Sequence, residues 1–374
     1  MFKFTKNLIL VWLTFFIILP ISVYSHPAWG IVVDSQKQIY FSDLEAVWKI
    51  DSQGKLSIFR AGVSGTHVHD LSIDKQDFIY GWYNSYEPQT EKHLRSFWKI
   101  SPNGQFTEIV PFTENLPSGM SIWRDSDGNM YSAEPWSNER RESKIIKRTP
   151  DGKTSLFAGG SFGYLDGKKE KARFGIIIDM AFAENGSIYL TDSNRVRKID
   201  NAGNVSTLYP KDNSQKNESS LFGLTVDERS NVLVADLANK KLLKIDSAGK
   251  ISTVLISDNS WTPLGVATFG NEIFVLEGKT YESKSTGNRV VKISSDNRKT
   301  VVADLNDANK TNNQPKSENV NFDLPNEQNN FSNSKSESNT NQTENKRLGL
   351  YGIIVAVIVA FAAFVFFRKN KFIG

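Results

Sequence analysis

Residues 188–206 read Ile-Tyr-Leu-Thr-Asp-Ser-Asn-Arg-Val-Arg-Lys-Ile-Asp-Asn-Ala-Gly-Asn-Val-Ser, and the second half of this stretch recurs along the chain. Each copy has a Lys, a Gly or Asn five positions later, and a Ser or Thr three positions after that. The intervals between successive copies are 50, 48, 51, 46 and 48 residues, a period typical of stacked supersecondary units. The six Lys residues are Lys49, Lys99, Lys147, Lys198, Lys244 and Lys292.

The turn position of the repeat is Gly in five copies and Asn297 in the sixth. Glycine adopts a positive φ without steric cost and Asn tolerates one, so this position predicts a two-residue hairpin turn. Two further strands precede each Lys, and the second of them contains an apolar pair. The first begins at Gly30, Asp70, Gly119, Asp179, Gly223 and Gly265. Each unit therefore holds four strands.

A four-stranded antiparallel unit of this length, repeated radially, is the blade of a β-propeller. Sustained helical periodicity, which a helical solenoid of similar period requires, is missing from this region. We therefore predict an all-β fold, a six-bladed β-propeller with four-stranded antiparallel blades, over residues 26–304. The expected blades are 27–62, 66–112, 116–160, 174–209, 221–257 and 261–304.

Residues 157–174, which are rich in Gly, and the following segment 188–200 resemble the NHL repeat with its glycine-rich spacer. The resemblance implies a six-bladed propeller that serves mainly as a binding platform, although some relatives are enzymes. It also implies that the acidic residue after each apolar pair forms structural hydrogen bonds. These acidic residues are Asp43, Glu134, Asp192, Asp236 and Glu277.

Both ends of the chain carry apolar segments. Lys3 and Lys6 precede an uncharged run, and small residues precede His26, which predicts a secretory signal peptide over residues 1–25. An uncleaved anchor is the alternative. Residues 348–367 contain no charge and are long enough to cross a bilayer as a C-terminal transmembrane helix. We expect a single-pass membrane protein with the propeller outside the cytoplasm and a short tail, 368–374, inside.

Residues 305–347 are dominated by Asn, Ser, Lys, Glu and Gln, which predicts a disordered linker. The chain has a formal net charge of +4 without a concentrated basic stripe, so we expect no nucleic-acid partner. It contains no Cys, which excludes disulfides, thiolate metal sites and a Cys nucleophile.

In a propeller, the connections between strands two and three and those between blades open on one face. The longest segments of this chain fall on that face, including 83–96, 134–144 and 158–175. Recognition residues concentrate on such variable loops, so this long-loop face is the predicted binding face. Its candidate ligand-binding residues are Trp82, Tyr83, Tyr86, His93, Arg95, Glu134, Trp136 and Arg140. Packing of the aromatic residues onto the blades is the alternative interpretation.

A second constellation, Thr66-His67-Val68-His69-Asp70, enters the second blade. Residues two apart on an extended segment project to the same side, so His67 and His69 are expected to converge near the mouth of the central channel. Asp70 and Asp179 replace Gly at the start of their blades, and His26 adds an imidazole if cleavage precedes it. These five residues are the candidate ligands of a divalent metal, although no complete ligand set is visible.

The sequence contains no phosphate-binding glycine loop, nucleophile elbow or supported Ser/His/Asp set. We therefore expect a membrane-tethered binding or scaffold module for a protein or carbohydrate ligand rather than an enzyme, and we predict no catalytic residue and no cofactor. The alternative is a metal-dependent hydrolase or lyase with its site at the mouth of the central channel.

Overall fold

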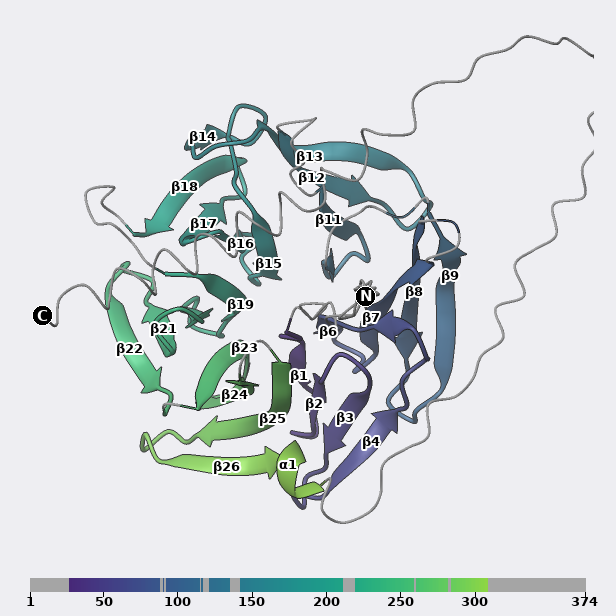
Figure 1. The fold of residues 1–374 in the computed structure, drawn as a ribbon. Coiled ribbons are helices and arrows are strands. Elements are labelled where there is room, and N and C mark those ends of the chain that lie inside the picture. Colours follow the sequence, from purple (N-terminus) through teal and green to yellow (C-terminus); the bar gives the residue numbers. More distant parts are fainter. Residues whose placement is uncertain are drawn as a thin grey trace, which may run out of the picture. The chain divides into compact units, whose positions relative to one another are not determined.

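The computed structural model describes residues 27–87, 90, 92–114, 116, 121–134, 142–210, 219–258, 260–281 and 284–308. These residues form six antiparallel sheets arranged radially as the blades of a ring (Figure 1). The predicted six-bladed, all-β propeller is therefore confirmed.

Blades 1 to 3 follow one another along the chain. Blade 1 contains β1 (Ile31–Val33), β2 (Ile39–Ser42), β3 (Val47–Ile50) and β4 (Leu56–Arg60). Blade 2 contains β5 (Thr66–His67), β6 (Leu71–Ile73), β7 (Ile79–Glu87), β8 (Lys92–Ile100) and β9 (Phe106–Thr113). Blade 3 contains β10 (Ile122–Arg124), β11 (Met130–Glu134), β12 (Glu142–Arg148) and β13 (Thr154–Ser161).

Blades 4 to 6 complete the ring. Blade 4 contains β14 (Gly167–Lys168), β15 (Ile177–Phe182), β16 (Ile188–Asp192), β17 (Arg195–Ile199) and β18 (Asn204–Tyr209). Blade 5 contains β19 (Leu221–Val226), β20 (Val232–Asp236), β21 (Lys241–Ile245) and β22 (Ile251–Ile256). Blade 6 contains β23 (Trp261–Phe269), β24 (Glu272–Tyr281), β25 (Lys284–Ile293) and β26 (Lys299–Asp304), and a short helix, α1 (Leu305–Ala308), follows it.

Two blades depart from the predicted four strands. The link into blade 2 contributes β5, which pairs with the distal part of β7, and the spacer before blade 4 contributes β14, which pairs with the outermost strand β18. Both extra strands come from connections between blades. There the extended backbone forms hydrogen bonds with an otherwise unpaired strand edge.

The repeated turn position has the predicted backbone conformation. The five glycines have φ between 73° and 89°, and Asn297 has φ 63°. The predicted two-residue turn is wrong, however. In blade 1 the backbone N–H of Asp51 donates to the carbonyl of Lys55 at 3.1 Å, which leaves three residues between the paired positions. This is the three-residue hairpin in which a left-handed residue follows a type I turn.

The hydrophobic core lies between the blades. The described buried apolar side chains form six clusters, and each cluster is shared by two neighbouring blades. The last and first blades share such a cluster, which includes Phe41 of blade 1 and Leu276 of blade 6. Each blade consists of consecutive strands, and no described strand is swapped between the last and first blades.

The repeated Lys residues face the strand beside them. In the first blade, for example, Lys49 lies opposite Tyr40 in the register and its Nζ lies 5.4 Å from the centre of the tyrosine ring. Lys147 and Lys198 make the same contact with Tyr131 and Tyr189. A cation over an aromatic ring explains these three residues without an anionic ligand, while Lys244 and Lys292 pair with Asp227 and Glu272 of the chain itself.

Differences in strand length determine which blades project furthest on the long-loop face. β7 and β8 each span nine residues, and β24 and β25 each span ten, whereas β2 and β3 of blade 1 each span four. Blade 1 lies between blades 6 and 2 in the ring (Figure 1). Two extended hairpins therefore flank the shortest blade on this face.

In the part of the chain that the structure describes, no helix has the length and apolar composition needed to cross a membrane. The predicted signal peptide and transmembrane helix lie outside the described residues, as does the linker apart from the residues of α1.

Candidate functional site

One register position of the innermost strands recurs in all six blades, and we call its residues the inner ring. The pairing registers place Gly30, Asp70 and Asp179 at this position, together with Gly223 and Gly265. In blade 3 the register places Ser121 there, because Ile122 pairs with Ser132 as Ile31 pairs with Phe41. The sequence-based assignment of Gly119 to this position is therefore wrong by two residues.

The three glycines of this inner ring are required by close backbone contacts. A Cβ atom on Gly265 would lie 1.9 Å from the carbonyl oxygen of Trp29, and one on Gly30 would lie 2.5 Å from the backbone nitrogen of Leu71. A Cβ atom on Gly223 would lie 2.7 Å from the Leu264 carbonyl oxygen. Blades 5, 6, 1 and 2 thus approach one another too closely for a side chain, while blades 2, 3 and 4 themselves carry polar side chains at this position.

Asp179 is the most extensively hydrogen-bonded of these polar residues. Its carboxylate accepts the indole N–H of Trp123 at 2.8 Å and the backbone N–H groups of Met180 and Leu224, each at 2.7 Å. Burial raises its pKa to about 6, while these three donors oppose the rise. Both carboxylate oxygens are engaged by blades 3, 4 and 5, which is the arrangement of a structural clamp.

Asp70 has fewer firm partners. Its carboxylate accepts the backbone N–H of Leu71 at 2.8 Å. Burial raises its pKa well above the usual range, and the negative charge of Asp179 raises it further. Trp29 and Ser121 lie near enough to lower this pKa, but the buried indole nitrogen and hydroxyl meet no partner with hydrogen-bond geometry. Asp70 is therefore the titratable group of the inner ring that is least satisfied by its neighbours.

The two histidines His67 and His69 differ in their exposure to solvent. His67 is exposed on β5, whereas His69 is buried with its ring centre 5.7 Å from that of Trp29. The two imidazole rings are nearly perpendicular, with centres 6.1 Å apart. The described residues contain no group of three or more His, Cys, Asp or Glu able to hold a metal ion. They do not complete the predicted site, and its remaining candidate, His26, lies outside them.

The predicted loop 83–96 is an extended hairpin, formed by the distal parts of β7 and β8. Trp82 and Tyr83 are 1% and 3% exposed, and Arg95 is also buried, with its guanidinium 5.9 Å from the Trp82 ring. The alternative interpretation, packing of the aromatic residues onto the blades, therefore applies to Trp82 and Tyr83. Tyr86, in contrast, is 51% exposed and pairs across the hairpin with His93.

The other candidate ligand-binding residues belong to blade 3. Glu134 ends β11 and is half-buried. Trp136 and Arg140 lie outside the described residues.

The repeated acidic position forms structural hydrogen bonds, as predicted, in blades 1, 4, 5 and 6. Asp43 accepts the indole N–H of Trp48 at 2.7 Å and two backbone N–H groups of its own turn. Asp236 accepts the hydroxyl of Ser219 at 2.8 Å. Glu277 accepts a hydrogen bond from Arg289 at 2.6 Å. These carboxylates hold the connections between strands in place.

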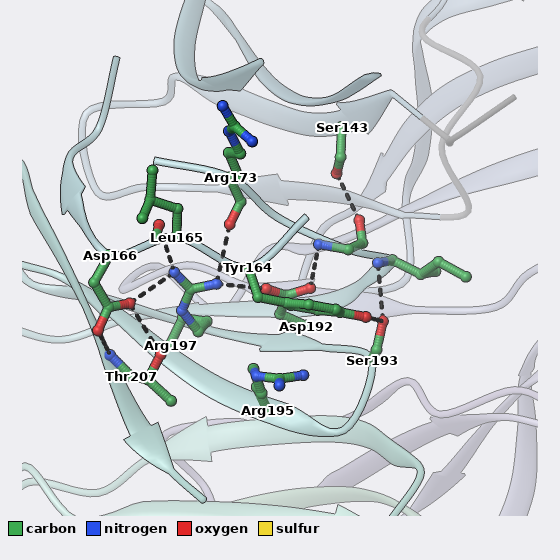
Figure 2. A network of polar contacts seen from close by, with 12 residues as sticks. Ser143, Tyr164, Leu165, Asp166, Arg173, Asp192, Ser193, Arg195, Arg197 and Thr207 are labelled. Atoms are coloured by element: carbon green, nitrogen blue, oxygen red, sulfur yellow. Dashed lines mark hydrogen bonds and ion pairs between the residues drawn. The ribbon is translucent and has the colours of Figure 1, made fainter. Parts of the chain in front are cut away.

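In blade 4 this acidic residue is part of a larger network (Figure 2). Asp192 and Arg197 are both completely buried, and their side chains meet at 2.7 Å. Arg197 also donates to Asp166 at 2.8 Å and to the backbone carbonyls of Leu165 and Arg173. Burial raises the pKa of Asp192 to about 6, and Arg197 opposes the rise.

This network fastens the glycine-rich spacer to blade 4. Asp192 accepts the backbone N–H of Gly175 at 2.6 Å, and Ser143 of blade 3 donates to the Gly175 carbonyl at the same distance. Phe174 and Ala172 of the spacer are buried beneath it. Sequence reasoning missed Arg197, although it occupies the position before the repeated Lys, where the other five blades have apolar residues. Those residues are Trp48, Trp98, Ile146, Leu243 and Val291.

The chain matches no protein-family model. It matches no curated protein. Solved structures with a similar fold include a virginiamycin B lyase from Staphylococcus aureus, at 15% identity and a TM-score of 0.45 over 74% of this chain and 83% of that one. A gluconolactonase from Xanthomonas campestris is 13% identical, with a TM-score of 0.46 over 67% of this chain and 84% of that one. A luciferin-regenerating enzyme is 15% identical, with a TM-score of 0.49 over 73% of this chain and 93% of that one. Such low similarity transfers none of these activities to this chain.

Proposed function

We propose that this protein is an extracytoplasmic, membrane-tethered propeller that binds a protein or carbohydrate ligand through its long-loop face. In this proposal residues 1–25 direct export, residues 348–367 anchor the chain in the membrane, and residues 305–347 connect the anchor to the ring. The resemblance of residues 157–174 and 188–200 to the NHL repeat supports a binding role, because propellers of that family serve mainly as binding platforms.

The observation that carries the proposal is the extended β7–β8 hairpin. It continues several residues beyond the strands of blade 1, and near its tip Tyr86 and His93 face each other with ring centres 4.9 Å apart. Burial and the nearby charge of Arg95 lower the pKa of His93, so its imidazole is neutral at neutral pH. A neutral histidine beside an exposed tyrosine is an amphipathic surface that suits a protein or sugar contact.

Two contacts hold the outer part of the hairpin in place. β5 pairs with its outer part through Thr66 and His67, and Lys92 forms a 2.6 Å ion pair with Glu114 beyond the end of β9. A binding element that is ordered before the ligand arrives loses less conformational entropy when the complex forms.

The experiment compares ligand capture by three forms of the full chain from solubilised membranes. The first is wild type, the second replaces residues 85–94 by Asn-Gly, and the third is the control Lys55→Ala, which alters an exposed turn on the opposite face. We expect the shortened hairpin to lose ligands that the control retains. Identical capture by all three forms would show that the β7–β8 hairpin is not the binding element.

The proposed membrane topology has its own measurement. Protease added to intact cells is expected to degrade the propeller while leaving a fragment that contains residues 348–374. A propeller protected until the membrane is permeabilised would place it on the cytoplasmic side.

The second candidate function is a hydrolase or lyase at the inner ring. The raised pKa of Asp70 favours a protonated carboxyl group, which is a proton donor, and Ser121 lies beside it. Metal analysis of purified wild type, His67→Ala and His69→Ala tests the metal-dependent form of this candidate. Equal metal content in all three proteins would count against these histidines as ligands.

A further inference from the structure

Three of the large apolar side chains most exposed on this protein lie together on blade 4. Tyr164 is 44% exposed, Leu165 is 47% exposed and Ile176 is 50% exposed. The hydroxyl of Tyr164 and the backbone N–H of Ile176 both donate to Ser193 Oγ, at 3.1 and 3.0 Å. These hydrogen bonds fix the two residues beside each other, so Tyr164 and Ile176 form one exposed apolar surface, and Leu165 follows Tyr164 directly in the chain.

Two arginines belong to the same surface. The Arg195 guanidinium lies 3.9 Å from the centre of the Tyr164 ring. Figure 2 shows the two side chains one below the other. Arg173 exchanges backbone hydrogen bonds with Leu165, at 3.1 and 3.2 Å. We call Tyr164, Leu165, Arg173, Ile176 and Arg195 the blade-4 platform.

The platform is held rigidly by groups beneath it. Ser193 has φ 59° in the two-residue turn between β16 and β17, and this turn brings Arg195 below Tyr164. The buried pair of Arg197 and Asp192 anchors the spacer on both sides of the platform. Burying an ion pair costs free energy because both charges are desolvated. This cost suggests that the ordered spacer has a role beyond exposing its side chains to water.

The two carboxylates near the platform, Asp166 and Asp192, share the single cation of Arg197. Asp166 accepts hydrogen bonds from Arg197 and from both the hydroxyl and the backbone N–H of Thr207. Asp192 is paired with Arg197. Among the described residues, Arg173 and Arg195 take part in no ion pair with a carboxylate, so the platform presents positive charge next to apolar groups.

We propose that the blade-4 platform binds an acidic segment of a partner protein that also carries apolar side chains. Exposed Tyr and Arg are the residue types that dominate protein interfaces, and a preorganised surface binds with a smaller entropy loss. Leu165 and Ile176 are aliphatic, and burying them requires an apolar partner surface, which a sugar offers only in small part. The inference rests on the proposed binding function and selects a protein over a carbohydrate ligand.

The test uses a phage-displayed library of random dodecapeptides, selected on the immobilised full chain. We expect the selected peptides to combine Asp or Glu with Leu, Ile or aromatic residues. Their affinity should fall at least tenfold on Tyr164→Ala and on Arg195→Ala, because the few hot-spot residues of an interface, which are enriched in Tyr and Arg, have effects of at least this size. Arg195→Lys should have an intermediate effect, since it keeps the charge and loses the planar contact with Tyr164.

The control is Leu156→Ala, which removes a side chain that is 52% exposed on the outer strand β13, away from the platform. It should bind the peptides as wild type does, and thermal unfolding of every variant verifies that the fold is retained. Selected peptides without an excess of acidic residues, or with equal affinity for Tyr164→Ala and wild type, would overturn the proposal. A selection that yields no binding peptide would also overturn it.

The shortened β7–β8 variant separates this inference from the proposed function. One outcome is that ligands bind the shortened hairpin more weakly but bind Tyr164→Ala as they bind wild type. This outcome would support the proposed binding function and contradict the blade-4 platform. Loss on Tyr164→Ala alone would support the platform and move the binding element away from the hairpin.

Discussion

The indole N–H of Trp123 in blade 3 donates a 2.8 Å hydrogen bond to the carboxylate of Asp179 in blade 4. The same carboxylate accepts the backbone N–H of Leu224 in blade 5. One side chain thus connects three consecutive blades across the inner ring, and it does so from a position that is a glycine in three other blades.

Replacing Asp179 by Ala is expected to lower the free energy of unfolding by about 3 kcal/mol, because three buried donors lose their acceptor together. Urea denaturation of the purified protein measures this change. The control, Asp127→Ala, removes an exposed carboxylate from a turn and should alter stability by less than about 0.5 kcal/mol. Equal midpoints for the two variants would show that the contacts of Asp179 are not stabilising.

The contribution of Asp179 to stability should depend on pH. Its pKa rises from an ordinary value of 3.8 to about 6 in the folded protein, so the folded state retains the proton at higher pH than the unfolded state does. The stability linked to this group is therefore complete below about pH 4 and is lost as the pH rises to about 6. We expect the difference in unfolding free energy between wild type and Asp179→Asn to fall by about 3 kcal/mol over this interval. A difference that is constant with pH would contradict the raised pKa.

Gly265 should not tolerate a side chain. A Cβ atom there would lie 1.9 Å from the Trp29 carbonyl oxygen, across the junction that closes the ring. Gly265→Ala is expected to destabilise the protein by about 3 kcal/mol, because backbone must move to relieve the clash. The matched control is Gly160→Ala, since a Cβ atom on Gly160 would meet nothing within 4 Å. Thermal unfolding of the two variants compares them directly.

Arg197 should stabilise the spacer more than the half-buried Arg195 does. Arg197→Leu leaves the buried carboxylate of Asp192 without its cation, which typically costs about 3–5 kcal/mol. We expect faster cleavage by trypsin at Lys168 and Lys171 of the spacer. Arg195→Ala should leave the cleavage rate unchanged, and adding Asp192→Asn to Arg197→Leu should restore part of the lost protection. Unchanged cleavage in Arg197→Leu would show that the network does not hold the spacer.

The first and last blades are expected to exchange their amide hydrogens fastest. No described strand of either blade is swapped into the other, so side-chain contacts, including the cluster of Phe41 and Leu276 and the ion pair of Lys37 with Glu272, hold the junction. Hydrogen exchange followed by mass spectrometry measures the rates blade by blade. Slowest exchange in blades 1 and 6 would contradict this expectation.

The repeat predicted the fold well because it reports on the backbone. A residue with positive φ every 46 to 51 positions marks one hairpin in each blade, and Asn297 has the left-handed conformation that its place in the pattern required. The register of an irregular strand is harder to read. In blade 3 the glycine at position 119 resembles the inner-ring glycines, but the pairing of Ile122 with Ser132 gives that place to Ser121.

The candidate site was predicted less well, because burial is a property of tertiary packing. Trp82 and Tyr83 lie on a strand that the sequence does not separate from a loop, and they pack between blade 2 and its two neighbouring blades. Tyr164 and Ile176 were not singled out, since their proximity depends on Ser193, which is distant in sequence from Tyr164. Arg197 stands at a repeat position that is apolar in the other five copies. This exception was the feature of the sequence that could have predicted the buried network.

The uneven inner ring has a consequence for redesign. Gly30, Gly223 and Gly265 have no side-chain atoms to remove, and their backbones already touch adjacent blades. An engineered cofactor pocket at the centre of the propeller would therefore have to be made in blades 2, 3 and 4. There, Asp70, Ser121 and Asp179 have side chains that can be replaced by smaller ones. Permuting the blade order would break this arrangement, so the six repeats are not interchangeable modules.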